Sequence, residues 1–266
     1  MAGELAPLAQ AFFAATPELS LQALGSGVHV PSLDLAPHGI PVTHLLAEHN
    51  AELARQYLTL NQLAFGGIGV PRWVLSDLYL LPGAIGLLRC PARLLKAPAR
   101  ERLLLADEEL AIGAACYVAP SLTPGLFVGV SLFSFLPGRG ASAWVKLLTL
   151  GMVRAKRLRG ITQWDNPAVR VHSRLGPMRL VGRVPGGHDY DERTFVYETD
   201  LSDEARVARA MLRGEGAAST AATRVPVTDL LVLGALLDRA EAGARLELVP
   251  PGQDDGHVLV RELPPG

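Results

Sequence analysis

The amino-acid sequence predicts an α+β fold, in which strands and helices alternate along one chain. Two apolar segments, residues 109–118 and 126–136, are separated by a turn at 120–125 that is too short for a parallel crossover, so we expect an antiparallel pair. Residues 43–65 and 141–159 instead repeat their apolar side chains every three or four positions, which predicts amphipathic helices.

The composition describes a chain that can build a large buried core. Of its 266 residues, 49% are hydrophobic and 19% are charged, which excludes a disordered protein. The formal charge of −1 gives no general attraction to nucleic acid or to an anionic membrane. No apolar stretch reaches the ~18 to 20 residues of a membrane span, and residues 1–13 lack the basic leader of a signal peptide. We therefore expect a cytoplasmic protein without nucleic-acid or membrane partners.

Cysteine and histidine spacing predicts no metal centre. Cys90 and Cys116 are too few for a disulfide framework or a thiolate cluster. His44 and His49 are five residues apart, which puts them on different faces of a helix. Neither a nucleotide-binding P-loop, a zinc-hydrolase helix nor a serine-hydrolase elbow is found.

The remaining elements follow from turn residues and apolar runs. Residues 1–41 are interrupted by prolines and form an N-terminal arm with one short helix at 5–15. Residues 201–266 form a C-terminal extension with helices at 202–212 and 228–242 and a hairpin at the end. In between, we expect strands at 73–80, 84–90, 161–164, 178–184 and 194–199, and a short helix at 166–175.

A glycine-containing turn at residues 135–140 connects a predicted strand to the long predicted helix. Gly138 and Gly140 let the backbone approach a ligand closely, and the helix N-terminus presents free N–H groups to an anion. A pyrophosphate would suit this turn, with Arg139 as an additional charge. The other interpretation is an ordinary strand-to-helix turn.

The stretch Asn166-Pro167-Ala168-Val169-Arg170-Val171-His172-Ser173-Arg174-Leu175-Gly176 resembles the signature of the GCN5-related N-acetyltransferase (GNAT) superfamily. Ala168, His172 and Gly176 keep the four-residue spacings of that signature, with Asn166 just before them. The resemblance covers residues 42–200. It implies a GNAT-like mixed, mostly antiparallel central sheet flanked by helices, between the N-terminal arm and a helical C-terminal extension.

The resemblance also implies an activity, the transfer of an acyl group from acetyl-CoA or another acyl-CoA to an amine that attacks the thioester directly. The acceptor would be a small-molecule amine or a protein N-terminus or lysine. The cofactor-binding residues implied are Gly138, Arg139, Gly140 and Ala141 around the pyrophosphate, together with Asn166. His172 takes the position of the tyrosine that protonates the departing thiolate, and Glu109 is the candidate for a water-linked general base.

Several alternatives stay open at this point. Phe135 stands where the family loop has a polar residue, and Pro177 stands where an aromatic residue is usual, as in a non-catalytic member that binds a ligand or a protein partner. His172 and Glu109 would then be a helix histidine and a solvated charge. The basic run 154–159 is interpreted as a solvated helix end. The apolar helix at 230–237 should pack on the domain or on a second subunit, and we expect a homodimer.

Overall fold

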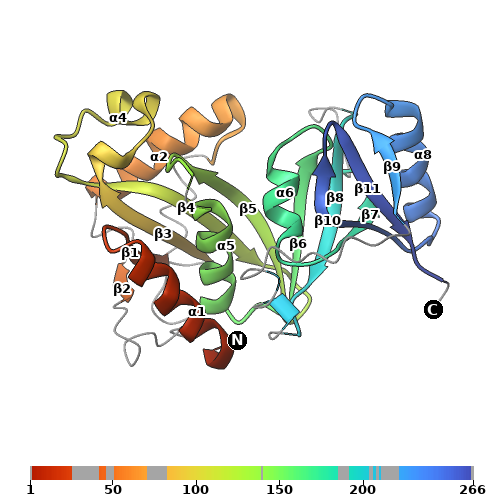
Figure 1. The fold of residues 1–266 in the computed structure, drawn as a ribbon, viewed down its shortest axis with the longest axis horizontal. Coiled ribbons are helices and arrows are strands. Elements are labelled where there is room, and N and C mark those ends of the chain that lie inside the picture. Colours follow the sequence, from red (N-terminus) through yellow and green to blue (C-terminus); the bar gives the residue numbers. More distant parts are fainter. Residues whose placement is uncertain are drawn as a thin grey trace. The chain divides into compact units, whose positions relative to one another are not determined.

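A computed structural model describes residues 2–25, 42–45, 51–70, 83–138, 140–184, 192–203, 206–207, 210 and 222–264 of the chain. The chain forms two compact units, Met1–Ala155 and Lys156–Gly266. Each unit contains its own group of strands and its own helices (Figure 1). The domain expected at residues 42–200 extends over both units, and it stays a prediction.

The first unit is built on five neighbouring strands, the first sheet, in the order β2-β1-β3-β4-β5. β1 and β2 are parallel, and every other neighbouring pair is antiparallel. The centre of the sheet is the most apolar part of the unit, since residues 84–90 and 111–118 are all buried. The strands are β1 (Ser20–Gly25), β2 (Val42–Leu45), β3 (Ala84–Pro91), β4 (Leu110–Pro120) and β5 (Leu126–Ser134).

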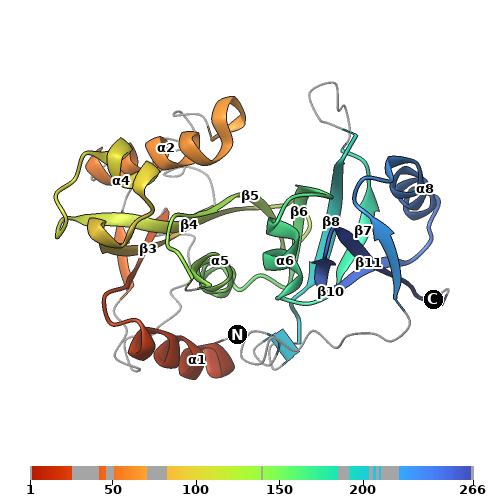
Figure 2. The same cartoon turned by 45° about the horizontal axis from the view of Figure 1, so that its top comes forward.

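Helices cover both faces of this sheet. α2 (Ala51–Phe65) and α4 (Ala97–Leu103) lie on one side, and α1 (Ala2–Ala15) and α5 (Ala141–Met152) lie on the other (Figure 2). α2 buries Leu53, Tyr57 and Leu60, whose spacing of four and three residues is that of one helix face. α5 packs on β3 and β4 and is buried over most of its length. Two short 3₁₀ turns, η3 (Gly66–Ile68) and η4 (Ala92–Leu94), follow α2 and β3.

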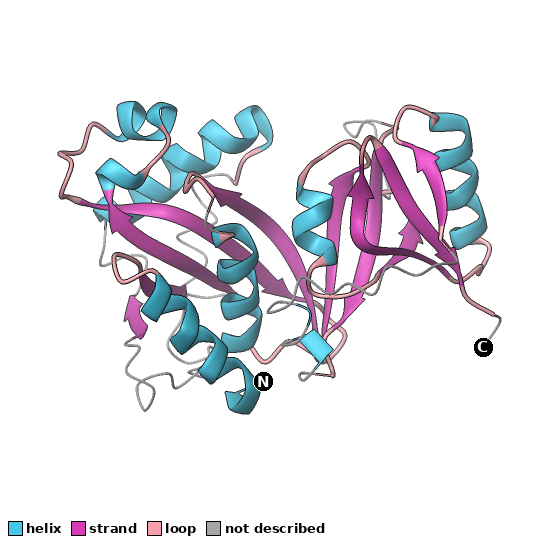
Figure 3. Cartoon of the chain, viewed as in Figure 1, coloured by secondary structure: helices cyan, strands magenta, loops and turns pink. Residues whose placement is uncertain are grey.

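The second unit is built on a group of antiparallel strands, the second sheet, and on helices that pack against it (Figure 3). Its strand order is β6-β8-β7-β10-β11-β9, and every pair is antiparallel. α6 (Ala168–Ser173) and α8 (Leu230–Glu241) contribute to one core with the inner face of the sheet. The strands are β6 (Arg157–Gln163), β7 (Met178–Gly182), β8 (Thr194–Asp200), β9 (Thr223–Pro226), β10 (Leu246–Asp254) and β11 (His257–Glu262).

The α+β class and the mostly antiparallel pairing predicted from the sequence are confirmed. The order strand, turn, helix, strand, short helix, strand predicted from residue 126 to 184 is present as β5, α5, β6, α6 and β7. The helix near 5–15 is α1, and the terminal hairpin is β10 with β11. The apolar helix at 228–242 is α8, which buries Leu233, Leu236 and Leu237 in the core of its own unit.

Two predicted helices have different limits in the structure. The helix expected at 141–159 ends at Met152, because Arg154 adopts a left-handed backbone conformation with φ of 51°. Residues 157–163 form β6 instead of a basic helix end. The helix expected from residue 43 begins at Ala51, and Val42–Leu45 is a strand paired with β1.

The two chain ends contribute more strands than expected. The N-terminal arm supplies β1 to the first sheet, and the extension after residue 200 supplies β9, β10 and β11 to the second. The strand expected at 73–80 lies outside the described residues, as does most of the helix expected at 202–212. Over the part of the chain that the structure describes, no helix combines the length and the apolar character that a membrane crossing requires.

Candidate functional site

The glycine turn predicted to hold an anion leads directly into α5. Gly138 and Gly140 have positive φ angles of 68° and 62°, a backbone conformation that residues other than glycine rarely adopt. A Cβ at Gly138 would meet no atom within 4 Å, so the space beside this backbone is open. Arg139 lies outside the described residues. The turn therefore combines a constrained backbone with free space next to it.

The first turn of α5 begins at this point. Gly140 is the N-cap residue, and its carbonyl accepts hydrogen bonds from the backbone N–H groups of Ala143 and Trp144 at 3.0 and 3.2 Å. Because the N-cap residue is a glycine, it has no side chain that could cap this helix N-terminus. The first N–H groups of a helix have no carbonyl partner within it, and they carry the positive end of the helix dipole. Ala141, the first residue of α5, is buried.

The packed face of α5 carries a lysine that sequence periodicity did not single out. Lys146 is 3% exposed and lies near Cys116 of β4. Burial lowers the pKa of the Lys146 ammonium to about 7, and the interaction with Cys116 opposes that shift. Burial also raises the pKa of the Cys116 thiol to about 12. A large fraction of Lys146 is therefore neutral at physiological pH.

Glu109, the candidate general base, lies in the turn before β4 and is exposed. Its Oε2 accepts a hydrogen bond from the backbone N–H of Ala106 at 2.5 Å. This hydrogen bond closes the turn before β4, and the Glu109 side chain is exposed to water. The structure does not test the role of Glu109 as a base.

Asn166 begins the short helix α6. Its Oδ1 accepts a hydrogen bond from the backbone N–H of Ala168 at 2.8 Å, and its carbonyl accepts one from Val169 at 3.0 Å. This arrangement satisfies two N–H groups of the first turn, as asparagine commonly does at helix starts. The amide oxygen of Asn166 has a structural role, and its predicted contact with a cofactor stays a prediction.

His172 lies in the last turn of α6 and is 8% exposed. Its ring packs against Tyr197 of β8, with a centroid distance of 5.3 Å and an angle of 31° between the ring planes. Tyr197 is registered opposite Gly160 of β6, where a Cβ would clash with the tyrosine hydroxyl. The histidine of the sequence motif is thus held against the two neighbouring strands β6 and β8.

Two hydroxyl groups on these strands lack hydrogen-bond partners within the described residues. Thr162 of β6 and Thr199 of β8 are 6% and 1% exposed, and their Oγ1 atoms are buried. Because side chains alternate along a strand, Thr199 lies on the same face of the sheet as Tyr197. Buried polar atoms usually have partners. The two threonine hydroxyl groups can therefore still form hydrogen bonds.

Gly176, the last residue of the motif, is positioned for a different reason. Its φ of 143° favours glycine, and a Cβ there would clash with the guanidinium of Arg206. Arg206 donates hydrogen bonds to the carbonyl oxygens of Leu175, at 3.4 Å, and Asp200. The motif glycine therefore accommodates an arginine that follows β8 in the chain.

The site residues predicted from the sequence fall into two groups, one in each unit. Gly138, Gly140 and Ala141 meet at the start of α5, and Glu109 lies in the same unit before β4. Asn166 and His172 lie at the two ends of α6. Within the described ranges, no three His, Cys, Asp or Glu side chains gather in a way that could hold a metal ion.

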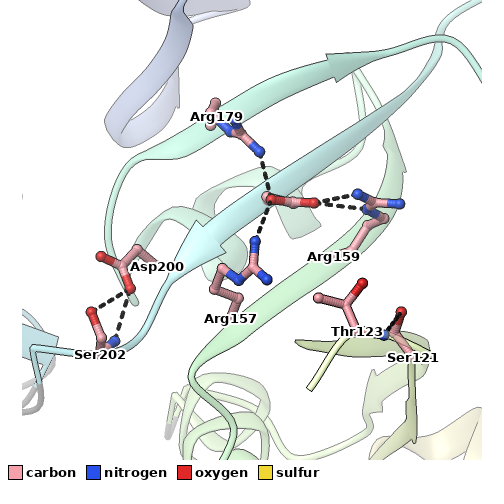
Figure 4. Close-up of polar contacts among 8 residues, drawn as sticks. Ser121, Thr123, Arg157, Arg159, Arg179, Asp200 and Ser202 are labelled. Carbon is pink, nitrogen blue, oxygen red and sulfur yellow. Dashed lines mark hydrogen bonds and ion pairs between the residues drawn. The ribbon is translucent and has the colours of Figure 1, made fainter. Parts of the chain in front are cut away.

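A buried carboxylate surrounded by arginines is a feature that sequence reasoning missed. Glu198 of β8 is 5% exposed and accepts hydrogen bonds from Arg159 and from Arg179, the latter at 2.6 Å. Arg157 approaches the same carboxylate at 4.0 Å. Figure 4 shows the three guanidinium groups pointing to it from different sides. The alternation Arg157-Leu158-Arg159-Gly160 is the signal in the sequence, but the same basic residues also fit the end of a helix.

The pKa of Glu198 reflects this environment. Burial by itself raises the pKa of the carboxyl, but the hydrogen bonds from Arg159 and Arg179 outweigh burial, so the pKa lies below its usual value. Glu198 is therefore ionised throughout the physiological pH range, and the arginines around it are held in fixed positions.

Comparisons with known proteins give only distant structural matches. No family model matches the chain, and neither does any curated protein sequence. A domain from Methanocaldococcus jannaschii is 11% identical, with a TM-score of 0.38 over 58% of this chain and 94% of that one. An acetyltransferase of the GNAT family from Staphylococcus aureus is 12% identical, with a TM-score of 0.34 over 58% and 94%.

A third match is an acetyltransferase from Streptococcus agalactiae, 12% identical, with a TM-score of 0.34 over 56% of this chain and 92% of that one. These TM-scores are too low to carry an argument about the function of the chain. The function proposed below therefore rests on the chain's own residues.

Proposed function

We propose that this protein is an acyl-CoA-dependent N-acyltransferase, which moves an acyl group from acetyl-CoA or another acyl-CoA to an amine. The observation that carries the proposal is the turn before α5. There, Gly138 and Gly140 hold positive φ angles, the space beside Gly138 is open, and the N-cap residue of the helix is a glycine. The signature-like spacing of Ala168, His172 and Gly176 supports the same function.

The proposed ligand of this turn is the pyrophosphate of a coenzyme A molecule. Backbone N–H groups at a helix N-terminus point outward and favour an anion, and α5 is 12 residues long. Without a Cβ at Gly138, a phosphate oxygen can reach the backbone directly. The N–H groups of Gly140 and Ala141 are the proposed donors, and Arg139 is proposed as an additional charge.

The proposed reaction needs few reactive groups, because the thioester is already activated. The amine nitrogen attacks the carbonyl carbon, a C–N bond forms, the C–S bond breaks, and coenzyme A leaves as a thiolate. Most of the rate would come from holding the two substrates together and from hydrogen bonds to the developing oxyanion. Acyl-CoA supplies the acyl group, and the acceptor is an amine on a small molecule or on a protein.

Two proton transfers complete the proposed reaction. The amine loses a proton, which Glu109 would accept through a water molecule, since its carboxylate is exposed. The thiolate gains a proton, which His172 would donate, because imidazole carries and releases protons near neutral pH. Tyr197 fixes the orientation of the His172 ring.

A non-catalytic protein that binds a ligand or a partner is the second candidate function. The observation that favours it is that Asn166 and Glu109 each make a local structural hydrogen bond, and that His172 is buried against Tyr197. In this case the glycine turn would bind acyl-CoA without turnover, or would serve only as a connection.

The first test is calorimetric titration of the full chain with acetyl-CoA and with octanoyl-CoA, using matched glycine variants. Gly138→Val fills the open space at the turn. Gly66→Val is the control, because Gly66 has a similar φ of 60°, equally open surroundings and a place in the same unit. We expect binding to the wild type and to Gly66→Val, and weaker binding to Gly138→Val. Equal affinities in both variants would show that the turn does not bind the coenzyme.

The second test separates catalysis from binding. His172→Phe should lower kcat in an assay of free thiol release with a panel of amines, while its Kd for acetyl-CoA stays unchanged. His257→Phe is the control and should keep full turnover, because His257 is the first residue of β11, next to the hairpin turn of the same unit. Acyl-CoA binding without turnover in the wild type, for every amine tried, would favour the non-catalytic function.

A further inference from the structure

The outer face of the second sheet carries a continuous row of alternating charges. Arg159 of β6 is registered opposite Glu198 of β8, which is opposite Arg179 of β7. Arg179 is in turn opposite Glu247 of β10, and Glu247 is opposite Arg261 of β11. Five neighbouring strands thus place arginine and glutamate alternately along one line. Opposite charges directly across a strand pair are stabilising, so this row fixes the orientation of its side chains.

A pocket of about 510 Å³ lies along this row and is lined by four of its five residues. The volume lies within the range of pockets that hold small molecules. The row supplies Arg179, Glu198, Glu247 and Arg261 to the wall. Arg157, Pro177, Thr199, Asp200, Arg206 and Leu263 complete the lining.

Cationic groups outnumber anionic ones around this pocket. Four arginines line it with three carboxylates, and a fifth arginine, Arg159, donates to Glu198 from the next position. The carboxylates are already engaged. Glu198 accepts from two arginines, Glu247 accepts from Arg261 at 2.8 Å, and Asp200 accepts from the Ser202 hydroxyl at 2.7 Å.

Two arginines of the lining, in contrast, have N–H groups that can form further hydrogen bonds. The guanidinium of Arg157 makes one ion pair at 4.0 Å and, within the described part of the chain, no hydrogen bond. The Nε of Arg261 is buried and has no partner among the described residues. A buried donor without a partner is costly, so an acceptor is expected to be supplied from outside the chain.

We propose that this pocket binds a phosphate group, either free or as the phosphoryl group of a small metabolite. Arg157, Arg179 and Arg261 approach from three different strands, and a tetrahedral phosphate accepts donors from several directions at once. A planar carboxylate is matched by the fork of a single arginine instead. Glu198 and Glu247 hold two of these guanidinium groups in place before the ligand arrives, which reduces the entropy that binding costs.

The pocket is much larger than a phosphate ion, so the experiment distinguishes the two sources of the group. Inorganic phosphate, glucose 6-phosphate and glucose are each titrated into the full chain by calorimetry at low ionic strength. Binding of glucose 6-phosphate but not of glucose is expected if the phosphoryl group is recognised. Tighter binding of glucose 6-phosphate than of inorganic phosphate identifies a metabolite as the ligand, and the reverse order identifies the free ion.

Variants locate the binding in the pocket. Arg157→Gln should weaken binding by about 10- to 100-fold, the loss expected for a hydrogen bond to a charged group. The mutation is expected to keep the fold, because this side chain makes no hydrogen bond to the described residues. Arg157→Lys keeps the charge but loses the forked guanidinium group, so its affinity should lie between those of the wild type and Arg157→Gln. Arg224→Gln is the control, since Arg224 pairs with Asp254 on the surface and does not line the pocket.

The glycine turn before α5 is a second place where a phosphate is proposed to bind, and one variant at each site separates the two. Gly138→Val should keep its affinity for glucose 6-phosphate, and Arg157→Gln should keep its affinity for acetyl-CoA. The proposal is overturned if Arg157→Gln binds glucose 6-phosphate and inorganic phosphate as tightly as the wild type does. It is also overturned if the wild type binds neither compound.

Discussion

Replacing Glu198 by glutamine tests whether the buried carboxylate holds the second unit together. Breaking one partner of a buried ion pair costs about 3 to 5 kcal/mol, because the other charge is left without compensation. Here the side chains of Arg159 and Arg179 are 43% and 53% exposed and can turn toward water. The expected loss of unfolding free energy in Glu198→Gln therefore lies at the lower end of this range, about 3 kcal/mol at pH 7.

The same variant has a pH dependence with a definite sign. The pKa of Glu198 in the folded protein lies below its value in the unfolded chain, which is about 4.3 for glutamate. The stabilisation by this carboxylate is fully present above the unfolded pKa and is lost as the pH falls through the folded pKa. The difference between wild type and Glu198→Gln should therefore be largest at neutral pH and should shrink in acid.

Hydrogen exchange measured by mass spectrometry localises the effect. A loss of about 3 kcal/mol should increase the exchange of β6 and β8 amides about 100-fold at pH 7, while β3 and β4 stay unchanged. Glu52→Gln is the control. Its partner Arg55 lowers the pKa of Glu52 to about 2, but the pair is half exposed, and surface pairs contribute at most ~1 kcal/mol. An effect of Glu198→Gln as small as that of the control, or one equal at pH 7 and in acid, would refute the reasoning.

Three further predictions concern single residues. Burial keeps the pKa of Lys146 near 7, below its unfolded value, so the unfolding free energy of the first unit should rise by up to ~1.4 kcal/mol per pH unit above pH 7, until the raised pKa of Cys116 opposes the gain. Chemical denaturation of Lys146→Met should show no such rise. Gly176→Ala should lower the unfolding free energy by about 1 to 3 kcal/mol, because alanine would have to keep a positive φ and Arg206 would have to move. A urea titration that shows no loss of unfolding free energy would contradict this. Asn166→Ala should cost about 1 kcal/mol in the same titration through loss of the α6 cap, with restoration expected in Asn166→Asp.

The sequence was informative where one local pattern dominated. α2 and α8 have apolar faces with helical spacing, and β4 and β5 are apolar runs separated by a short turn, so their type could be predicted. The turn at Gly138 and Gly140 was found for the same reason. Glycines between a strand and a helix favour positive φ angles, and both residues adopt them.

The sequence was misleading where two periodicities overlapped. Leu158 continues the helical spacing of α5, but it also fits the alternation of a strand in which Arg157 and Arg159 face the other way. Whether the residues around Leu158 form a helix or a strand depends on two features. Arg154 has a left-handed conformation that ends the helical region, and β6 pairs with β8, which is distant in the sequence. Neither is visible in a local pattern. The Glu198 cluster was missed as a consequence, because its partners come from strands far apart in the sequence.

The strand order of the second unit has a consequence for how this protein can be shortened or cleaved. β10 pairs with β7, and Leu246, Leu248, Val258 and Val260 belong to the same core as Trp164 and Phe195. A chain that stopped at residue 200 would leave β7 as an open edge with unpaired backbone groups and would expose an apolar face. Such an edge is a template for aggregation. Fragments cut after β8, by a protease or by early termination, should therefore be recovered as insoluble material rather than as a smaller folded protein.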